Sequence, residues 1–402
     1  MLDFDTAQAR LAARARPPVE QETLPLAALH GRVLATDIVA ALDLPPADNS
    51  AMDGYAVRAA DTAAAPTALP VQQRCFAGQA PQALLPGQAI RLFTGSVIPA
   101  GADTVVMQED CQEDESGVTF QTPALAGQHI RHRGEDMRQG SRILAQGALL
   151  EAGQIAVLAA QGFAQASVYA PLKVGILTTG DELVAPGDPL PPAAIYNSNA
   201  AMLASLCQGL RTAPALLRHA RDDAQAIEAA LEDLAQTCDL VLSVGGASVG
   251  EKDLVKPAIE SLGGTLDLWR VRMKPGKPVA LADLKGRPIV CLPGNPVSAF
   301  AVFTVLVSPL IRGLQGRNRI LPPTRRGILQ TDRPLGGDRD DFVRIQASLA
   351  PSGATMLTPH AQQSSGALSS LAWADGLARI PAGSQLSSGA DVSWYALSDW
   401  LR

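Results

Sequence analysis

The strongest constraint on the fold is an alternation of apolar and amphipathic segments that begins near residue 173. Buried-strand patterns at 173–177, 215–218 and 240–244 alternate with helix patterns at 199–210 and 224–236. This alternation predicts an α/β domain with a mostly parallel sheet covered by helices on both faces. Ligands of such folds bind at the carboxyl ends of the strands. The residues that follow each strand are therefore the first candidates for a site.

Polar loops that contain glycine follow two of these strands. The loop after the first strand contributes the candidate binding residues Thr179, Gly180, Asp181 and Glu182. The loop after the third contributes Gly245, Gly246, Ser248 and Gly250. Backbone N–H groups of such loops can hold phosphate or carboxylate oxygens. The second loop matches neither the Walker A pattern nor G-x-G-x-x-G, which counts against ATPase and Rossmann functions. Taken alone, each loop also fits an ordinary turn.

Carboxylates recur in the same region of the chain. Glu182, Asp222 and Asp253 each follow a predicted strand or lie in its exit loop. Because Mg²⁺ prefers carboxylate oxygens together with substrate phosphate, these acids predict a metal–phosphate site. Capping of a helix N-terminus is the alternative role for Asp222 and its neighbour Asp223.

Two further loops combine proline with glycine, M-K-P-G-K-P at 273–278 and L-P-G-N-P-V-S at 292–298. Proline fixes loop shape, glycine lets the backbone approach a ligand, and a helix start after Asn295 offers N–H groups to negative oxygens. Lys274 and Lys277 supply local positive charge in a chain of net charge −6. The sequence therefore predicts a site for an anionic ligand. The candidate residues of the second loop are Pro293, Gly294, Asn295, Pro296 and Ser298.

A chain of 402 residues is too long for one compact core. Residues 1–45 and 137–172 carry helical patterns and are predicted to join into one N-terminal region. Residues 46–136 contain short β-like runs broken by proline and glycine, which predict an inserted β domain. Residues 173–318 form the predicted α/β domain, and 319–402 return to short strands typical of a small barrel or sandwich.

Composition excludes several classes of function. The 33 lysines and arginines are scattered, which argues against nucleic acid as the main partner. The first residues lack the features of a secretory signal, and we expect no apolar stretch to reach the length of a membrane span. Five widely spaced cysteines without C-x-x-C indicate reduced, buried thiols rather than a catalytic thiol. These features predict a cytoplasmic protein.

Six segments together closely resemble the molybdopterin molybdenumtransferase family, which includes the bacterial molybdenum-insertion enzyme and the E domain of gephyrin. The resemblance spans nearly the whole chain, and the segments occur in the family's order. They are S-A-M-D-G-Y-A at 50–56, R-G-E-D at 133–136, T-G-D-E at 179–182, S-V-G-G-A-S-V-G at 243–250, K-P-G-K-P at 274–278 and L-P-G-N-P-V-S at 292–298.

The resemblance implies a fold and a reaction. The implied fold has an elongated N-terminal helical region, an inserted β domain, a molybdopterin-binding α/β domain and a C-terminal β-barrel. The implied reaction inserts molybdate into the dithiolene of adenylylated molybdopterin, while Mg²⁺ assists cleavage of the pyrophosphate link and AMP is released. The implied assembly is a homodimer, with each cleft formed by the α/β domain of one subunit and the inserted domain of the other. Implied partners are a molybdopterin adenylyltransferase and the molybdoenzymes that accept the cofactor.

The resemblance also assigns roles to residues of this sequence. It implies catalytic roles for Asp53, Thr94, Asp136, Glu182, Asp222, Asp253, Lys274 and Lys277. Among these, Glu182, Asp222 and Asp253 would organise Mg²⁺, and the two lysines would face molybdate or phosphate. Asn197 departs from the family, which often has aspartate there. An amide keeps the hydrogen-bonding shape without the charge, so we expect it to bind pterin or nucleotide rather than metal.

Two other functions stay open at this stage. A molybdopterin adenylyltransferase shares the α/β domain and its glycine-rich loop but normally lacks the flanking domains. A scaffold is the second alternative, because the gephyrin E domain also binds receptor peptides. No sequence feature marks a peptide groove, so the molybdenumtransferase hypothesis leads.

Overall fold

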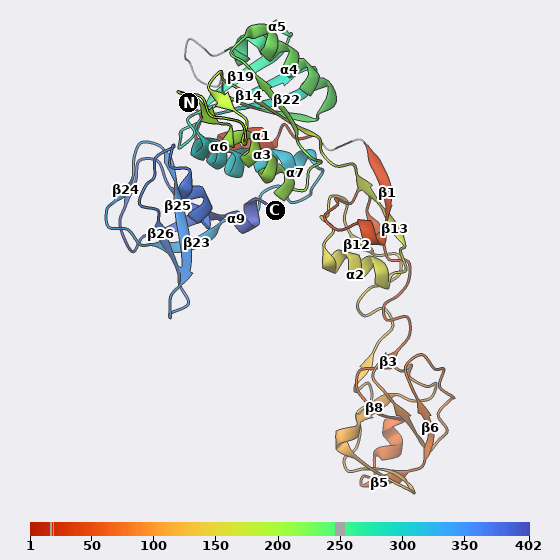
Figure 1. Cartoon of the computed structure of the whole chain (residues 1–402). Helices are drawn as coiled ribbons and strands as arrows, with labels where there is room; N and C mark the ends of the chain where they lie inside the picture. The colour runs from red at the N-terminus through yellow and green to blue at the C-terminus, as the bar shows by residue number, and fades with distance from the viewer. Residues whose placement is uncertain (17, 19, 246–253) are drawn as a thin grey trace. The chain divides into compact units, whose positions relative to one another are not determined.

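The computed structural model (Figure 1) describes residues 1–16, 18, 20–245 and 254–402. The chain divides into two compact units, each assembled from separate segments of sequence. The first comprises Met1–Ala35, Gly147–Glu151 and Ala166–Arg402. The second comprises Thr36–Gln146 and Ala152–Gln165. The domain boundaries drawn from the sequence stay predictions.

A mixed sheet forms the centre of the first unit. Its strands, in spatial order, are β17 (Leu216–Ala220), β14 (Val174–Thr179), β18 (Leu240–Val244), β22 (Arg287–Leu292), β21 (Pro278–Leu284) and β19 (Thr265–Arg270). The first four run parallel, whereas β21 and β19 are antiparallel to their neighbours. The predicted mostly parallel sheet is confirmed.

Helices cover both faces of this sheet (Figure 1). They are α1 (Phe4–Ala12), α3 (Ser198–Gly209), α4 (Ala224–Thr237), α5 (Val255–Ser261), α6 (Pro296–Val302) and α7 (Ser308–Leu314). Successive strand residues point to opposite faces, so Ile176 packs in one core with Leu203 of α3, and Leu177 packs in the other with Leu231 of α4. The predicted burial of β14 on both faces follows from this arrangement.

One sequence expectation is wrong. The helix Pro296–Leu314, which includes a π-helical turn at Phe303–Val307, is long and apolar enough to match a membrane span by length and composition. Its most apolar window is entirely buried within the structure, where it packs against the sheet and α1. This is the composition of a helix buried on all sides in a protein core.

The end of the chain forms a closed barrel. Its strands are β23 (Arg325–Leu329), β25 (Asp340–Leu349), β26 (Thr355–Pro359), β27 (Gly376–Ile380) and β29 (Asp391–Ala396). Strand β25 pairs with both β26 and β27, and β23 and β29 complete the ring. The short strand β20 (Met273–Lys274) of the α/β domain pairs in parallel with β25. The barrel implied by the family resemblance is confirmed.

The second unit is mainly β-structure. One sheet contains, in spatial order, β6 (Val71–Cys75), β7 (Ala89–Leu92), β4 (Gly54–Val57) and β8 (Thr104–Met107). It shares a core with a smaller sheet of β5 (Thr67–Leu69), β10 (Gly117–Phe120) and β9 (Cys111–Asp114). Near the unit's ends, β2 (Ile38–Val39) pairs with β12 (Arg142–Leu144), and α2 spans Ala152–Ala160. In the first unit, β1 (Gln21–Pro25) likewise pairs with β13 (Gln165–Tyr169). Segments before and after the strands of the second unit therefore pair with each other.

Arg379 links the N-terminal helix to the barrel. Its two terminal nitrogens donate to the Asp5 carboxylate at 2.7 and 2.8 Å, and its Nε donates to Asp340 at 2.7 Å. The guanidinium lies 4.7 Å from the ring centroid of the fully buried Phe4. Because Asp340 is buried, it depends on this arginine for its charge partner.

Replacing Arg379 with methionine should lower the free energy of unfolding by about 3 kcal/mol, because a buried carboxylate loses its partner. Arg326→Met is the matched control, since the Arg326–Asp391 pair is more than half exposed on both sides. The control should cost less than about 1 kcal/mol. Urea unfolding followed by tryptophan fluorescence measures both. Equal losses in the two variants would contradict the role assigned to Arg379.

Candidate functional site

A cleft of about 670 Å³ opens where parallel strands of the central sheet end. Thr179 at the end of β14, Val244 at the end of β18 and Pro293 just after β22 all line it. This is the edge at which a parallel sheet is expected to present its ligand. The cleft thus lies where the strand pattern predicted it.

Many of the predicted binding residues line this cleft. From the strand exits and the start of α3 they are Thr179, Glu182, Asn197 and Gly245. From the second proline–glycine loop they are Pro293, Gly294, Asn295, Pro296 and Ser298. The structure therefore brings together segments more than 110 positions apart in the sequence, from 179 to 298.

Two glycines allow neighbouring segments of the chain to approach each other closely at this edge of the sheet. Gly245 has φ of +97°, and a Cβ atom there would lie 2.7 Å from Thr179 Oγ1. A Cβ atom on Gly180 would lie 2.4 Å from Glu182 Oε2. A larger residue at position 245 would therefore collide with the Thr179 hydroxyl, and one at position 180 would collide with the Glu182 carboxylate.

Asn197 has a clear structural role in addition to its place in the cleft. Its Oδ1 accepts from the Ala200 N–H at 3.2 Å and so caps α3, while its Nδ2 donates to Thr178 Oγ1 at 2.8 Å. An amide can do both, whereas a carboxylate could only accept. These contacts explain how asparagine fits the position where the family often has aspartate.

The second proline–glycine loop is fixed by side chains from distant segments. Asn199 Nδ2 donates to the Gly294 carbonyl at 2.7 Å, and its buried Oδ1 makes no hydrogen bond within the described residues. Asn295 Nδ2 donates to Ser365 Oγ at 3.2 Å and forms no side-chain cap on α6. Pro296 is the first residue of that helix. The helix start therefore leaves its N–H groups uncapped at the cleft, as the anion-site prediction requires.

The two lysines of the first proline–glycine loop have different environments. Lys274 Nζ lies 2.9 Å from Asp341 Oδ2 of strand β25 and is thus partly neutralised by the barrel. The Lys277 side chain is exposed and makes no hydrogen bond or ion pair among the described residues, although the Lys277 carbonyl accepts from the Val271 N–H at 3.2 Å. Neither lines the cleft, although Pro278 does. A Cβ atom on Gly276 would lie 2.5 Å from Val302 Cγ2, so this loop packs against α6.

The candidate metal ligands are only partly gathered. Asp181 Oδ1 accepts from the Asp222 N–H at 3.3 Å, which brings the loops after β14 and β17 together. Asp223 caps α4 by accepting from the Ala226 N–H at 2.9 Å, so the capping alternative holds for that residue. Among the described residues, no three His, Cys, Asp or Glu side chains form a metal-binding group.

Four predicted residues cannot be placed. Gly246, Ser248, Gly250 and Asp253 lie outside the described residues. Their assignment to phosphate and Mg²⁺ stays a prediction.

In the second unit, Asp53 and Thr94 meet although 41 positions separate them. The Thr94 N–H and hydroxyl donate to Asp53 Oδ1 at 2.7 and 2.8 Å. These two bonds, the backbone one first, hold the pKa of Asp53 below its ordinary value. Asp136 lies in the same unit with an exposed side chain, and its N–H donates to the Leu44 carbonyl at 3.1 Å.

The five cysteines are free thiols, four of them buried. Burial raises the pKa of Cys207 to about 12. Formation of a thiolate is therefore unfavourable at Cys207.

Sequence reasoning missed the partners that fix the loops. Asp341, Ser365 and Asn199 hold Lys274, Asn295 and Gly294, respectively. The first two come from the barrel, about 70 positions after the loops they contact. No local pattern marks such pairs. Of the three partners, only Asn199 lies in a segment that the sequence marks, because it stands near Asn197 at the start of a predicted helix.

Three family profiles match the chain in succession. The MoeA N-terminal region (domains I and II) matches residues 2–162, a probable molybdopterin-binding domain matches 175–313, and the MoeA C-terminal region (domain IV) matches 326–397. The central match contains every described residue that lines the cleft.

Named relatives and a solved structure agree with these matches. The molybdopterin molybdenumtransferase of Haemophilus influenzae is 39% identical over 347 residues, which cover 86% of this chain and 85% of the relative. The enzyme of the same name from Synechococcus elongatus is 37% identical, with coverage of 96% and 97%. A crystal structure of the MoeA protein of Pyrococcus horikoshii OT3 matches with a TM-score of 0.83 at 30% identity, covering 98% of this chain and all of that one. The chain belongs to the MoeA family of molybdopterin molybdenumtransferases.

Proposed function

We propose that this protein inserts molybdenum from molybdate into adenylylated molybdopterin, with Mg²⁺-dependent release of AMP. The observation that carries the proposal is the cleft at the carboxyl edge of the sheet, because residues from four of the six family-specific segments line it. The relatives named molybdopterin molybdenumtransferase support the same reaction.

The described residues offer suitable groups for an anionic substrate. The uncapped N-terminus of α6 and the Ser298 hydroxyl would donate to phosphate or molybdate oxygens. Lys277, whose charge is not offset by a described partner, would attract molybdate to the same loop region. Lys274 would act with its charge tempered by Asp341.

The acidic side chains offer carboxylate oxygens, which are the ligands that a hard divalent cation such as Mg²⁺ prefers. Mg²⁺ usually keeps several waters and takes one or two protein carboxylates together with substrate phosphate, so a complete protein cage is not required. Glu182 in the cleft and Asp222 beside Asp181 would hold it, and Asp253 is the third proposed ligand. When bound, the ion would offset the negative charge of the pyrophosphate during cleavage.

Several finer assignments belong to the proposal; the family resemblance implies the homodimer and its shared cleft, and the sequence features imply the location. They are a homodimer, a cytoplasmic location, and a cleft completed by Asp53, Thr94 and Asp136 of the partner copy. The paired Asp53 and Thr94 support a joint role because two hydrogen bonds hold the carboxylate beside the threonine hydroxyl.

The adenylyltransferase and scaffold alternatives receive less support. Matches to the N-terminal and C-terminal MoeA regions cover the parts that a single-domain adenylyltransferase lacks. Incubation with adenylylated molybdopterin, Mg²⁺ and molybdate should release AMP and reconstitute an apo molybdoenzyme. AMP formation without reconstitution would overturn the proposed insertion, and formation of adenylylated molybdopterin from ATP would favour the adenylyltransferase.

Replacing Lys277 with alanine should raise the molybdate concentration needed for half-maximal insertion by about tenfold, the effect of losing one charged contact worth about 1.4 kcal/mol. Folding should not change, because the side chain is exposed. Lys285→Ala is a matched control on another surface turn, where Lys285 pairs with Glu232. An unchanged molybdate requirement in Lys277→Ala would reject the assignment.

Replacing Gly245 with alanine should reduce insertion activity more than tenfold, because the added Cβ would displace the Thr179 hydroxyl and the backbone has positive φ. Gly263→Ala provides a control with positive φ and no neighbour within 4 Å of the added Cβ. Activity assays and thermal unfolding of both variants separate loss of the site from general strain. Full activity in Gly245→Ala would refute the close approach.

Replacing Thr94 with valine removes one donor to Asp53 and should raise the pKa of that carboxyl toward its ordinary value. The acidic limb of the pH–activity profile should then move to higher pH, because Asp53 becomes protonated sooner as pH falls. Carbon-13 NMR titration of Asp53 measures the shift directly, and Thr94→Ser should preserve the wild-type value. An identical titration in Thr94→Val would show that the hydroxyl does not stabilise the charge.

A further inference from the structure

A short excursion between β14 and α3 exposes two large side chains at the cleft. Strand β15 (Leu183–Val184) pairs in parallel with β16 (Ile195–Tyr196) within this segment. Ile195 is 56% exposed and Tyr196 is 44% exposed, and both line the cleft. Single exposed apolar side chains are common on protein surfaces, but two adjacent ones in the wall of a cleft provide a contact surface for a ligand.

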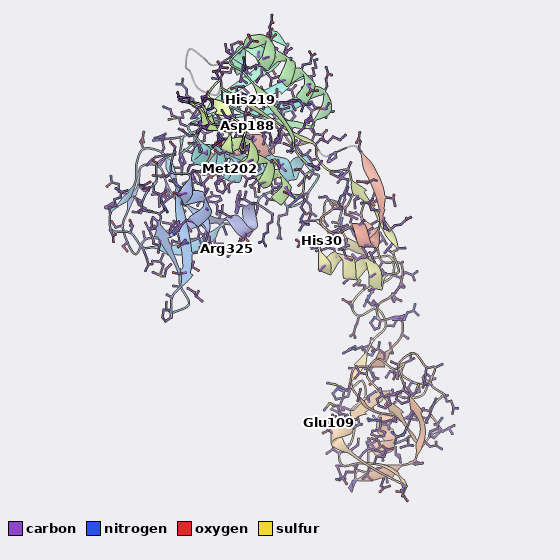
Figure 2. The ribbon with its side chains drawn as sticks, in the orientation of Figure 1. His30, Glu109, Asp188, Met202, His219 and Arg325 are labelled. Carbon is purple, nitrogen blue, oxygen red and sulfur yellow. The ribbon has the colours of Figure 1, made fainter. Side chains whose placement is uncertain are left out.

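The backbone around these side chains is held in place. The Ile195 N–H donates to the Glu182 carbonyl at 2.8 Å, and the Asn197 N–H donates to the Val184 carbonyl at 2.9 Å. The Tyr196 hydroxyl donates to the Asp188 carbonyl at 3.1 Å; Asp188 is labelled in Figure 2. The phenol is thus anchored by its polar end, while the rest of the side chain is partly exposed in the cleft wall.

The wall of the cleft has an apolar part and a polar part. Ile195, Tyr196 and the rings of Pro278, Pro293 and Pro296 contribute apolar surface to the lining. Hydroxyl, amide and carboxylate groups from the strand exits contribute the polar surface. A ligand that complements both parts combines a flat ring system with anionic groups, because the Ser298 hydroxyl and the uncapped start of α6 can donate to negative oxygens.

We infer that Tyr196 and Ile195 form a shelf against which a fused nitrogen heterocycle of the substrate stacks. The inference rests on the proposed function, whose substrate carries two such ring systems, a pterin and an adenine. Stacking depends on the ring face of Tyr196, because its hydroxyl is already bonded to Asp188. Tyr196 is therefore a positioning and specificity residue of the cleft and takes no part in bond cleavage.

Binding to the full-length protein tests this inference with molybdopterin and AMP as separate probes. Tyr196→Ala should raise the Kd of one probe about tenfold, the loss expected for one stacking contact. Tyr196→Phe keeps the ring and should stay within about threefold of the wild type, since only one neutral hydrogen bond is lost. Leu190→Ala is the local control, because Leu190 is 47% exposed in the same excursion but does not line the cleft.

The two probes identify the occupant. Weaker molybdopterin binding with unchanged AMP binding assigns the shelf to the pterin, and the opposite result assigns it to the adenine. If wild-type protein binds either probe and Tyr196→Ala binds both as tightly, the shelf is refuted while the proposed function stands. If the wild type binds neither probe, the proposed function fails and the shelf fails with it.

Discussion

The whole arrangement depends on the burial of the parallel strands β14, β18 and β22 between two layers of helices. Their residues alternate between two apolar cores, so neither sheet face can present a polar site. Polar groups are therefore confined to the strand ends, where the chain leaves the core. The cleft lies at the carboxyl end, and its hydroxyl, amide and carboxylate groups come from these exits.

The barrel contributes to this edge although it is a separate layer of structure. Strand β20 pairs in parallel with barrel strand β25, so the lysine loop contacts both the α/β domain and the barrel. Lys274 pairs with Asp341, and Asn295 donates to Ser365 on another barrel segment. Arg379 joins the same barrel to the N-terminal helix. The positions of the two proline–glycine loops thus depend on contacts with residues far along the chain.

Local patterns were sufficient to predict much of this. Strand and helix periodicities located β18 at 240–244 and α4 near 224–236, and the Asn295–Pro296 pair marked the start of α6. Barrel closure and the contacts of Asp341 and Ser365 were not predictable, because they depend on pairing across long stretches of sequence. The apolar length of helix Pro296–Leu314 was underestimated because its prolines, serines and arginine interrupt the run, although the folded helix buries all of them except Pro296. The site residues came from recognisable loops, whereas the partners that fix those loops did not.

The central claim is that substrate binds at the carboxyl edge of the sheet. Hydrogen–deuterium exchange of the full chain, with and without adenylylated molybdopterin, tests this most directly. The account predicts slower exchange at residues 179–184, 195–199 and 292–298, which line the cleft or lie directly beside its lining residues. It predicts unchanged exchange at 170–173 and 286–288, which border a separate cavity near the opposite ends of the strands. Protection confined to this second set would contradict the account.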